Sequence, residues 1–140
     1  MTELMHRVKV FVFRLGRAEP DYLLLRGAGR EGLWGPIHGN IGFGEKLETA
    51  IRREVMDDVG IARPVDLIDL RMPSRWLLGD EEVIEWTFGC RILPAHDPLH
   101  VSDRWADFRW ADFRDAYPSL ELEPDRAAIM RLHTLLFDAA

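Results

Sequence analysis

The chain has 140 residues, of which 47% are hydrophobic and 30% are charged, and its formal net charge at pH 7 is −6. This length and composition suit one globular domain with its own core, and the acidic balance argues against a partner that is a nucleic-acid polymer. Cys90 is the only cysteine, which excludes an intrachain disulfide and a cysteine-rich zinc site. No apolar run approaches the ~18 residues of a membrane span, and the N-terminus lacks a signal-peptide pattern. We therefore expect a soluble, cytoplasmic protein with no membrane partner.

The first half of the chain predicts three strands and a helix. Residues 6–15 are rich in Val and Phe, typical of a strand buried on both faces, and residues 22–26 (YLLLR) predict its hairpin partner. Residues 33–38 predict a short third strand. From Leu47 to Val59 the chain has no Gly or Pro and its apolar residues recur at helical spacing, which predicts a helix.

The second half predicts three more strands. Residues 65–72 and 83–93 predict two of them, joined by a hairpin connection over PSRWLLGDEE, and residues 108–110 predict the last. We expect residues 94–103 to form a polar loop. The acidic side chains near the hairpin are expected to face solvent: Glu81, Glu82 and Glu85.

Two helices are expected after the last strand. Asp112 can cap a short helix that runs to Tyr117, and Pro124 is a good residue for the first turn of a final helix. That final helix places four apolar residues on one stripe: Ile129, Leu132, Leu135 and Leu136. Helices before and after a mixed sheet indicate an α/β/α sandwich.

The segment from Gly39 to Ile61, GNIGFGEKLETAIRREVMDDVGI, carries the chemistry. On the predicted helix Glu54, Asp57 and Asp58 stand at i, i+3 and i+4 and share one face. Glu45 lies just ahead, in a glycine-rich loop that can fold back over that face. Carboxylates gathered in a small volume repel each other unless a cation lies among them, so the pattern predicts a site for a hard divalent cation. An amphipathic helix with a solvated acidic face would explain only the three acids of the helix.

This segment resembles the Nudix box: Gly, five residues, Glu, seven residues, Arg-Glu-apolar, one residue, two acids, one residue, Gly-apolar. The resemblance implies an α/β fold of the Nudix type, an α/β/α sandwich with a central mixed sheet, in a single domain over residues 1–140 with the box at 39–61. It also implies a hydrolase that uses Mg²⁺, with Mn²⁺ as an alternative, to cleave a phosphoanhydride in a small nucleotide or pyrophosphate substrate. The family permits both monomers and homodimers.

Motif position suggests a role for each box residue. Glu54 and Asp58 resemble the main metal ligands of the family, with Asp57 beside them. A backbone carbonyl near His38 or Gly39 would complete part of the metal's coordination. The paired Asp residues replace a more frequent Glu pair, and each is one methylene shorter.

Arg53 cannot bind a cation. The resemblance implies that it pairs with a loop carboxylate, Glu45, and holds the loop against the helix. The general base stays open among Glu54, Glu45 and a downstream acid. Gly42 stands where the family loop often has a Glu, so one potential carboxylate is missing.

Within the family, the chain looks most like the branch that hydrolyses dihydroneopterin triphosphate and dATP-type nucleoside triphosphates. The supporting features are Trp34 before the box, RREV in the helix and FRWADFRDA before the final helix. In that branch an acid six positions before the last-strand Trp contributes to the metal site. Counting back from Trp110 gives Arg104, and the adjacent Asp103 is the candidate metal ligand.

Four residues are candidates for contact with the substrate: Gly39, Arg26, Trp34 and His38. Five aromatic side chains could stack on a base: Trp34, Phe43, Trp76, Trp86 and Trp105. Two alternatives to a nucleoside triphosphate hydrolase stay open. One is a hydrolase of dinucleoside polyphosphates or nucleotide sugars, and the other is a non-catalytic module that binds a nucleotide.

Overall fold

The computed structural model describes residues 3–28, 32–94 and 99–138. The three helices lie where the sequence patterns predict them. The elements in chain order are β1 (Glu3–Leu15), β2 (Pro20–Gly27), β3 (Trp34–Gly35), β4 (Ile37–Asn40), α1 (Leu47–Val59), β5 (Asp66–Asp69), β6 (Ser74–Leu78), β7 (Glu81–Arg91), β8 (Trp105–Ala111), α2 (Phe113–Ser119) and α3 (Glu123–Asp138).

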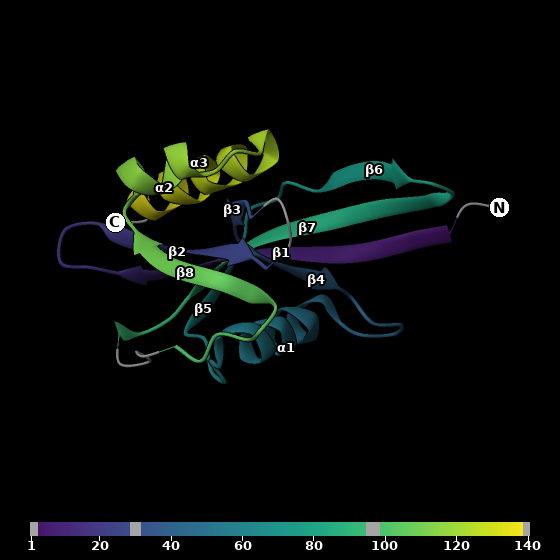
Figure 1. Ribbon diagram of the computed structural model, residues 1–140, viewed down its shortest axis with the longest axis horizontal. Coiled ribbons are helices and arrows are strands. Elements are labelled where there is room, and N and C mark those ends of the chain that lie inside the picture. The colour runs from purple at the N-terminus through teal and green to yellow at the C-terminus, as the bar shows by residue number, and fades with distance from the viewer. Residues whose placement is uncertain (1–2, 29–31, 95–98, 139–140) are drawn as a thin grey trace.

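The strands form one mixed sheet in which β1 and β7 are the long central pair. These two run parallel, with Glu3 opposite Glu81 and Phe13 opposite Arg91, and every other described pair is antiparallel. The main path is β3-β2-β1-β7-β5, while β4 joins β1, β6 joins β7 and β8 joins β2. In Figure 1 the ends of β1, β6 and β7 project to the right, beyond the helices.

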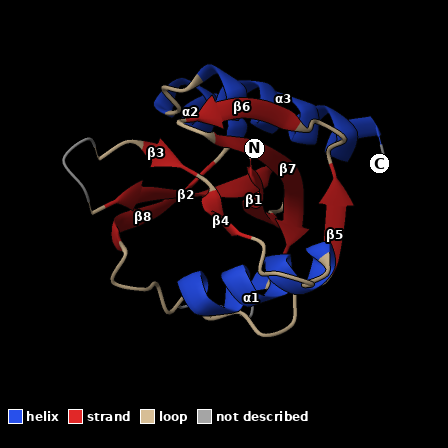
Figure 2. Ribbon diagram, turned by 90° about the vertical axis from the view of Figure 1, so that its right-hand side faces the viewer, coloured by secondary structure: helices blue, strands red, loops and turns tan. Residues whose placement is uncertain are grey.

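Helices cover both faces of the sheet. Figures 1 and 2 show α1 on one face and α2 with α3 on the other. The alternation along β1 explains this, because Val8, Val10 and Val12 pack in the core on the α1 side while Phe11 and Phe13 pack in the core on the α3 side. The predicted α/β/α sandwich with a mixed central sheet is therefore confirmed.

Two predicted segments differ in detail. The strand expected over residues 33–38 is two short strands, since the chain passes from a β2 partner to a β1 partner at Pro36. The connection expected over residues 73–82 contains strand β6, which pairs along β7 and turns at Gly79–Asp80. Of the loop expected over 94–103, residues 95–98 lie outside the described residues. Among the described helices, none is long and apolar enough to cross a bilayer.

Candidate active site

Helix α1 presents two buried carboxylates to the interior of the site. The side chains of Glu54 and Asp58 lie one turn apart, and the two residues are only 7% and 3% exposed. Asp57 lies between them in sequence but is exposed. Within the described residues, no three acidic, histidine or cysteine side chains converge as a ready-made metal site. The sequence thus predicts the position of the acid pair well, and the structure separates Asp57 from it.

Arg53 fastens the glycine-rich loop to the helix. Its Nε and Nη2 donate to the two carboxylate oxygens of Glu45, each at 2.9 Å, and Nη1 donates to Glu54 Oε1 at 2.8 Å. Glu45 also accepts the Gly42 N–H at 2.8 Å, and Nη2 reaches the Asn40 carbonyl at 2.9 Å. The hydrogen bonds from Arg53 lower the pKa of Glu45 to about 2. The fork geometry matches the Arg–Glu pairing that the box implies.

Gly39 lets strand β4 approach the acid pair. A Cβ atom at this position would overlap the carboxylate group of Glu54. Any side chain would therefore displace Glu54. At the other end of α1, Gly60 adopts the left-handed conformation (φ 77°) that terminates the helix, and a Cβ there would meet His100 at 2.8 Å.

The segment that leads into β8 is held against the end of α1. The N–H groups of His100 and Ser102 donate to the carbonyls of Val59 and Asp58, at 3.1 Å and 2.9 Å. The turn that follows exposes Asp103. The same turn directs the next side chain, Arg104, toward the two acids. The assignment of Asp103 as a metal ligand stays a prediction.

Arg104 supplies the positive charge nearest the acid pair on this side. Its Nη1 lies 3.7 Å from Glu54 Oε2 and 3.6 Å from Asp58 Oδ2, and its Nη2 donates to the carbonyl oxygen of His38. Burial raises the pKa of Asp58, and the charge of Arg104 opposes that rise. Among the described residues, two buried atoms at this place lack a hydrogen-bond partner: Asp58 Oδ2 and Trp105 Nε1. The indole N–H is close enough to favour the charged form of Asp58 without completing a hydrogen bond to Oδ2.

His38 links the acid pair to a large cavity. Its Nδ1 faces Arg7 Nη2 at 3.0 Å and Arg104 Nη2 at 3.3 Å, and its ring packs edge-on against Trp105. Burial, together with the neighbouring cations, lowers the pKa of His38 to about 4. The imidazole is therefore neutral at pH 7, with Nδ1 facing both guanidinium groups.

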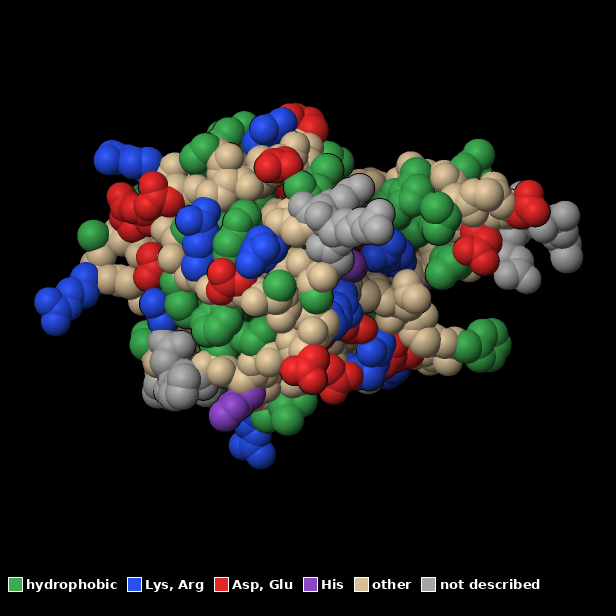
Figure 3. Space-filling model, in the orientation of Figure 1, with side chains coloured by type: hydrophobic (Ala, Val, Ile, Leu, Met, Phe, Trp, Pro, Cys, Tyr) green, Lys and Arg blue, Asp and Glu red, His purple; other side chains and the backbone are tan. Residues whose placement is uncertain are grey.

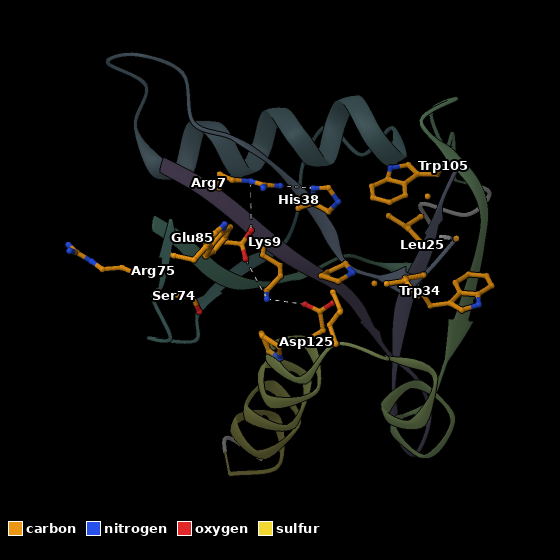
Figure 4. Close-up of a pocket in the computed structure, with 18 residues that line it drawn as sticks. Arg7, Lys9, Leu25, Trp34, His38, Ser74, Arg75, Glu85, Trp105 and Asp125 are labelled. Atoms are coloured by element: carbon orange, nitrogen blue, oxygen red, sulfur yellow. Dashed lines mark hydrogen bonds and ion pairs between the residues drawn. The ribbon is translucent and has the colours of Figure 1, made fainter. Parts of the chain in front are cut away.

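The cavity has a volume of about 890 Å³, and its lining includes His38 and Trp105, which both contact Arg104. Its floor carries the buried residues Lys9, Glu85 and Asp125, which Figure 4 shows together with Arg7. Lys9 Nζ lies 2.9 Å from Asp125 Oδ1 and 3.6 Å from Glu85 Oε1, while Arg7 Nε lies 3.9 Å from Glu85 Oε2. On the face in Figure 3, basic and acidic side chains gather near the hollow between the main body and the projecting strands.

Aromatic side chains form the walls of this cavity. Three of the five stacking candidates line it, Trp34, Trp76 and Trp105, whereas Phe43 and Trp86 line a separate hollow beside the glycine-rich loop. The guanidinium of Arg26 lies 5.8 Å from the centre of the Trp34 ring, within 4.0 Å of Asp107. Arg26 thus lies next to a cavity wall and is not one of the residues that line the cavity.

The expectation that Glu85 faces solvent is wrong. The β1–β7 pairing buries it, at 8% exposure, against Arg7 and Lys9. The sequence carried a signal for two members of this cluster, because Lys9 lies between two valines and Glu85 lies between Ile84 and Trp86. Asp125 follows Pro124 in the first turn of α3 and gave no comparable signal.

Comparison with known proteins gives the same architecture. The model of the NUDIX domain matches residues 5–133. A protein from Listeria monocytogenes, described as a NUDIX hydrolase, superposes with a TM-score of 0.83 at 17% identity, covering 96% of this chain and 95% of that one. The Ap4A hydrolase of C. elegans, solved as a binary complex, gives a TM-score of 0.76 at 16% identity, with coverages of 96% and 98%.

The dihydroneopterin triphosphate pyrophosphohydrolase of E. coli gives a TM-score of 0.72 at 19% identity, covering 91% of this chain and 94% of that one. At these identities the solved structures show the shared fold, and no curated protein matches significantly. The match to the family model spans most of the chain. The chain therefore belongs to the NUDIX family and is a Nudix hydrolase, an enzyme that acts on acid anhydrides.

Proposed function

We propose that the enzyme, with residues 1–140 as one Nudix domain, is a metal-dependent pyrophosphohydrolase of a nucleoside triphosphate or a related nucleoside-diphosphate-linked compound. The observation that carries this proposal is the junction between the acid pair and the cavity. His38 and Trp105 line the cavity, and both contact Arg104, which in turn faces Glu54 and Asp58. A ligand in the cavity can therefore extend its phosphates to the acids.

The residues present fit a divalent cation. Asp58 Oδ2 is buried without a hydrogen-bond partner, and Gly39 leaves room against Glu54 that a Cβ would fill. Mg²⁺ or Mn²⁺ would be held by Glu54 and Asp58 with the His38 or Gly39 carbonyl, and Asp57 and Asp103 are further candidates. Mg²⁺ usually keeps several waters and takes substrate phosphates as ligands, so two buried carboxylates are a sufficient protein contribution. When bound, the ion would neutralise phosphate oxygens and acidify a water molecule.

The chain's own residues hold and orient the substrate. Arg53 and Glu45 fix the loop that follows strand β4, and the strand itself carries the His38 and Gly39 carbonyls. The general base stays open among Glu54, Glu45 and a downstream acid. The flat wall of Trp34 suits the face of a heterocyclic base. The guanidinium groups of Arg109 and Arg26 lie 4.9 Å and 5.8 Å from the centre of the indole ring, and these cation–π contacts favour its position.

The substrate is proposed to be of the dihydroneopterin triphosphate or dATP type. Trp34, the helix sequence RREV and the segment FRWADFRDA support this choice. The fold likeness to an Ap4A hydrolase favours a second candidate, a dinucleoside polyphosphate, and a nucleotide sugar is a further variant.

A panel of these compounds, incubated with the enzyme and Mg²⁺, tests the proposal. Release of pyrophosphate and a nucleoside monophosphate supports the triphosphate substrate, whereas two nucleotide products from a dinucleoside compound favour the second candidate. Calorimetry with the same compounds measures binding and so tests the alternative of a non-catalytic module that binds a nucleotide. Nucleotide binding with Mg²⁺ but no product over hours would contradict the proposed hydrolysis.

A further inference from the structure

The place proposed for the metal already faces a positive charge. Arg104 approaches Glu54 Oε2 and Asp58 Oδ2 at 3.7 Å and 3.6 Å, and it donates to the His38 carbonyl. These are groups to which the ion is assigned above. We propose that Arg104 is the resident cation of the metal-free site, and that a divalent ion binds by displacing its guanidinium from the two carboxylates.

A resident cation is needed because the acids are buried together. Glu54 and Asp58 lie one helical turn apart and are almost completely enclosed. Two carboxylates in such a position destabilise the fold unless a positive charge compensates them. Arg53 compensates one oxygen of Glu54, at 2.8 Å, and reaches no oxygen of Asp58 in a described contact. In the described part of the chain, Arg104 is the positively charged side chain that lies within 4.0 Å of the Asp58 carboxylate.

The contacts of Arg104 with the acids are weak enough to be exchanged. Both distances are longer than a hydrogen bond, and Asp58 Oδ2 has no hydrogen-bond partner. Both guanidinium groups are partly exposed, at 39% for Arg104 and 38% for Arg53, so water screens their charges to the same extent. Arg53, by contrast, is fixed by two hydrogen bonds to Glu45. Of the two guanidinium groups beside Glu54, Arg104 is therefore the one that an incoming ion displaces.

The exchange requires only a side-chain movement. The backbone before β8 is held to α1 through the Ser102 N–H, and the Trp105 N–H donates to the Ser102 carbonyl at 3.1 Å. Arg104 also has contacts that do not involve the acids, with the Trp105 ring at 4.7 Å from its centre and His38 Nδ1 at 3.3 Å. These contacts can keep the guanidinium at the cavity wall after the ion has taken the carboxylates.

Titration with Mn²⁺ alone, followed by electron paramagnetic resonance of the free ion, tests this inference without an activity assay. In Arg104→Gln the ion no longer competes with a guanidinium, and we expect it to bind about tenfold more tightly than in the parent enzyme. In EDTA the same variant should melt at a lower temperature, and Mn²⁺ should raise its melting temperature by more than it raises that of the parent.

Arg52→Gln is the matched control. It removes one positive charge from α1, and Arg52 has similar exposure and pairs with Glu48 at 3.0 Å, apart from the acid pair. Its Mn²⁺ affinity should equal that of the parent. Arg104→Lys keeps the charge without the planar fork, and its affinity should fall between those of the parent and Arg104→Gln, which tests the inference even if Arg104→Gln does not fold.

The inference rests on the proposed metal site, and the titration separates the two. Equal or weaker Mn²⁺ binding in Arg104→Gln, in a parent enzyme that binds the ion, overturns the role of Arg104 alone. Failure of the parent to bind Mn²⁺, or unchanged binding in Glu54→Gln, overturns the metal site and this inference together.

Discussion

Two charged clusters lie side by side in this enzyme, and their chemistry differs. The box cluster consists of Glu45, Arg53, Glu54, Asp58 and Arg104, with three acids and two bases. The floor cluster consists of Arg7, Lys9, Glu85 and Asp125, with two acids and two bases. In the box cluster the buried atom without a partner is an acceptor, Asp58 Oδ2, whereas in the floor cluster it is a donor, Arg7 Nε.

The difference indicates what each cluster is suited to bind. A surplus carboxylate with a free oxygen suits a cation. A balanced floor with a free N–H suits the acceptor atoms of a base or sugar. His38 contacts an arginine from each cluster, Arg104 and Arg7, so the two halves of one nucleotide would meet across this residue.

Within the box cluster, removing the charge of Glu54 should cause the largest loss of activity. Glu54→Gln keeps the shape of the side chain but loses a proposed metal ligand, and we expect kcat/KM to fall at least about 1,000-fold, a barrier increase of about 4 kcal/mol. Steady-state kinetics on the nucleotide that the parent enzyme hydrolyses measure the fall in kcat/KM, and circular dichroism should show an unchanged fold. Activity at the parent rate would show that Glu54 is not a metal ligand.

Disrupting the floor cluster should affect the stability of the fold more than the rate of catalysis. Lys9→Met leaves Glu85 and Asp125 buried without their shared ammonium, and we expect a loss of about 3 kcal/mol in the free energy of unfolding. Urea denaturation measures this loss. Adding Asp125→Asn should recover part of it, because the second change removes one of the unpaired charges. No recovery would contradict direct charge pairing on the cavity floor.

Arg53→Lys should have a smaller effect, on the geometry of the box loop. A lysine cannot make the forked contact with Glu45 and also reach Glu54, so we expect about a tenfold decrease in kcat/KM, equal to about 1.4 kcal/mol. Kinetics at several Mg²⁺ concentrations provide the measurement. If saturating Mg²⁺ and substrate restore the parent rate completely, the loop only assists binding.

The smallest effect is expected from the pH dependence of stability. Glu45 has a pKa of about 2 in the folded protein, below its ordinary value of 4.5. Its contribution to stability is therefore present above pH 4.5 and is lost as the pH falls from 4.5 to 2. The variant Glu45→Gln lacks this contribution. Between pH 5 and pH 3 its free energy of unfolding, measured with urea, should therefore fall less than that of the parent. An equal slope would mean that Arg53 does not hold Glu45 in solution.

Local patterns in the sequence predicted four members of the box cluster, Glu45, Arg53, Glu54 and Asp58. The spacing of Glu54 and Asp58 on one helix, and the loop glycines before Glu45, are short-range features. The structure shows the Arg53–Glu45 pairing at that location. Helix α1 and the cap of α2 by Asp112 also follow from local signals.

The floor cluster could not be predicted as a whole, although Lys9 and Glu85 stand out among apolar neighbours, because its members meet through long-range pairing. Lys9 and Glu85 come together only through the parallel register of β1 and β7, and Asp125 joins them from a helix more than a hundred residues after Lys9 in the chain. Strand β6 was not predicted for a similar reason. Pro73 and Gly79 on either side of it are typical of a connecting segment, and only the pairing with β7 identifies the residues between them as a strand. Arg104 was visible as a departure from the family pattern, but its contacts with the acids required the fold.

A crystal soaked with Mn²⁺ and a non-hydrolysable nucleoside triphosphate would show which residues hold the ion and where the nucleotide lies. We expect an anomalous peak within coordination distance of Glu54 and Asp58, with the phosphates at that ion and the base in the cavity beside Trp34. We also expect Arg104 to have moved away from the carboxylates. A peak at another site, with Arg104 still between His38 and the two acids, would contradict these expectations.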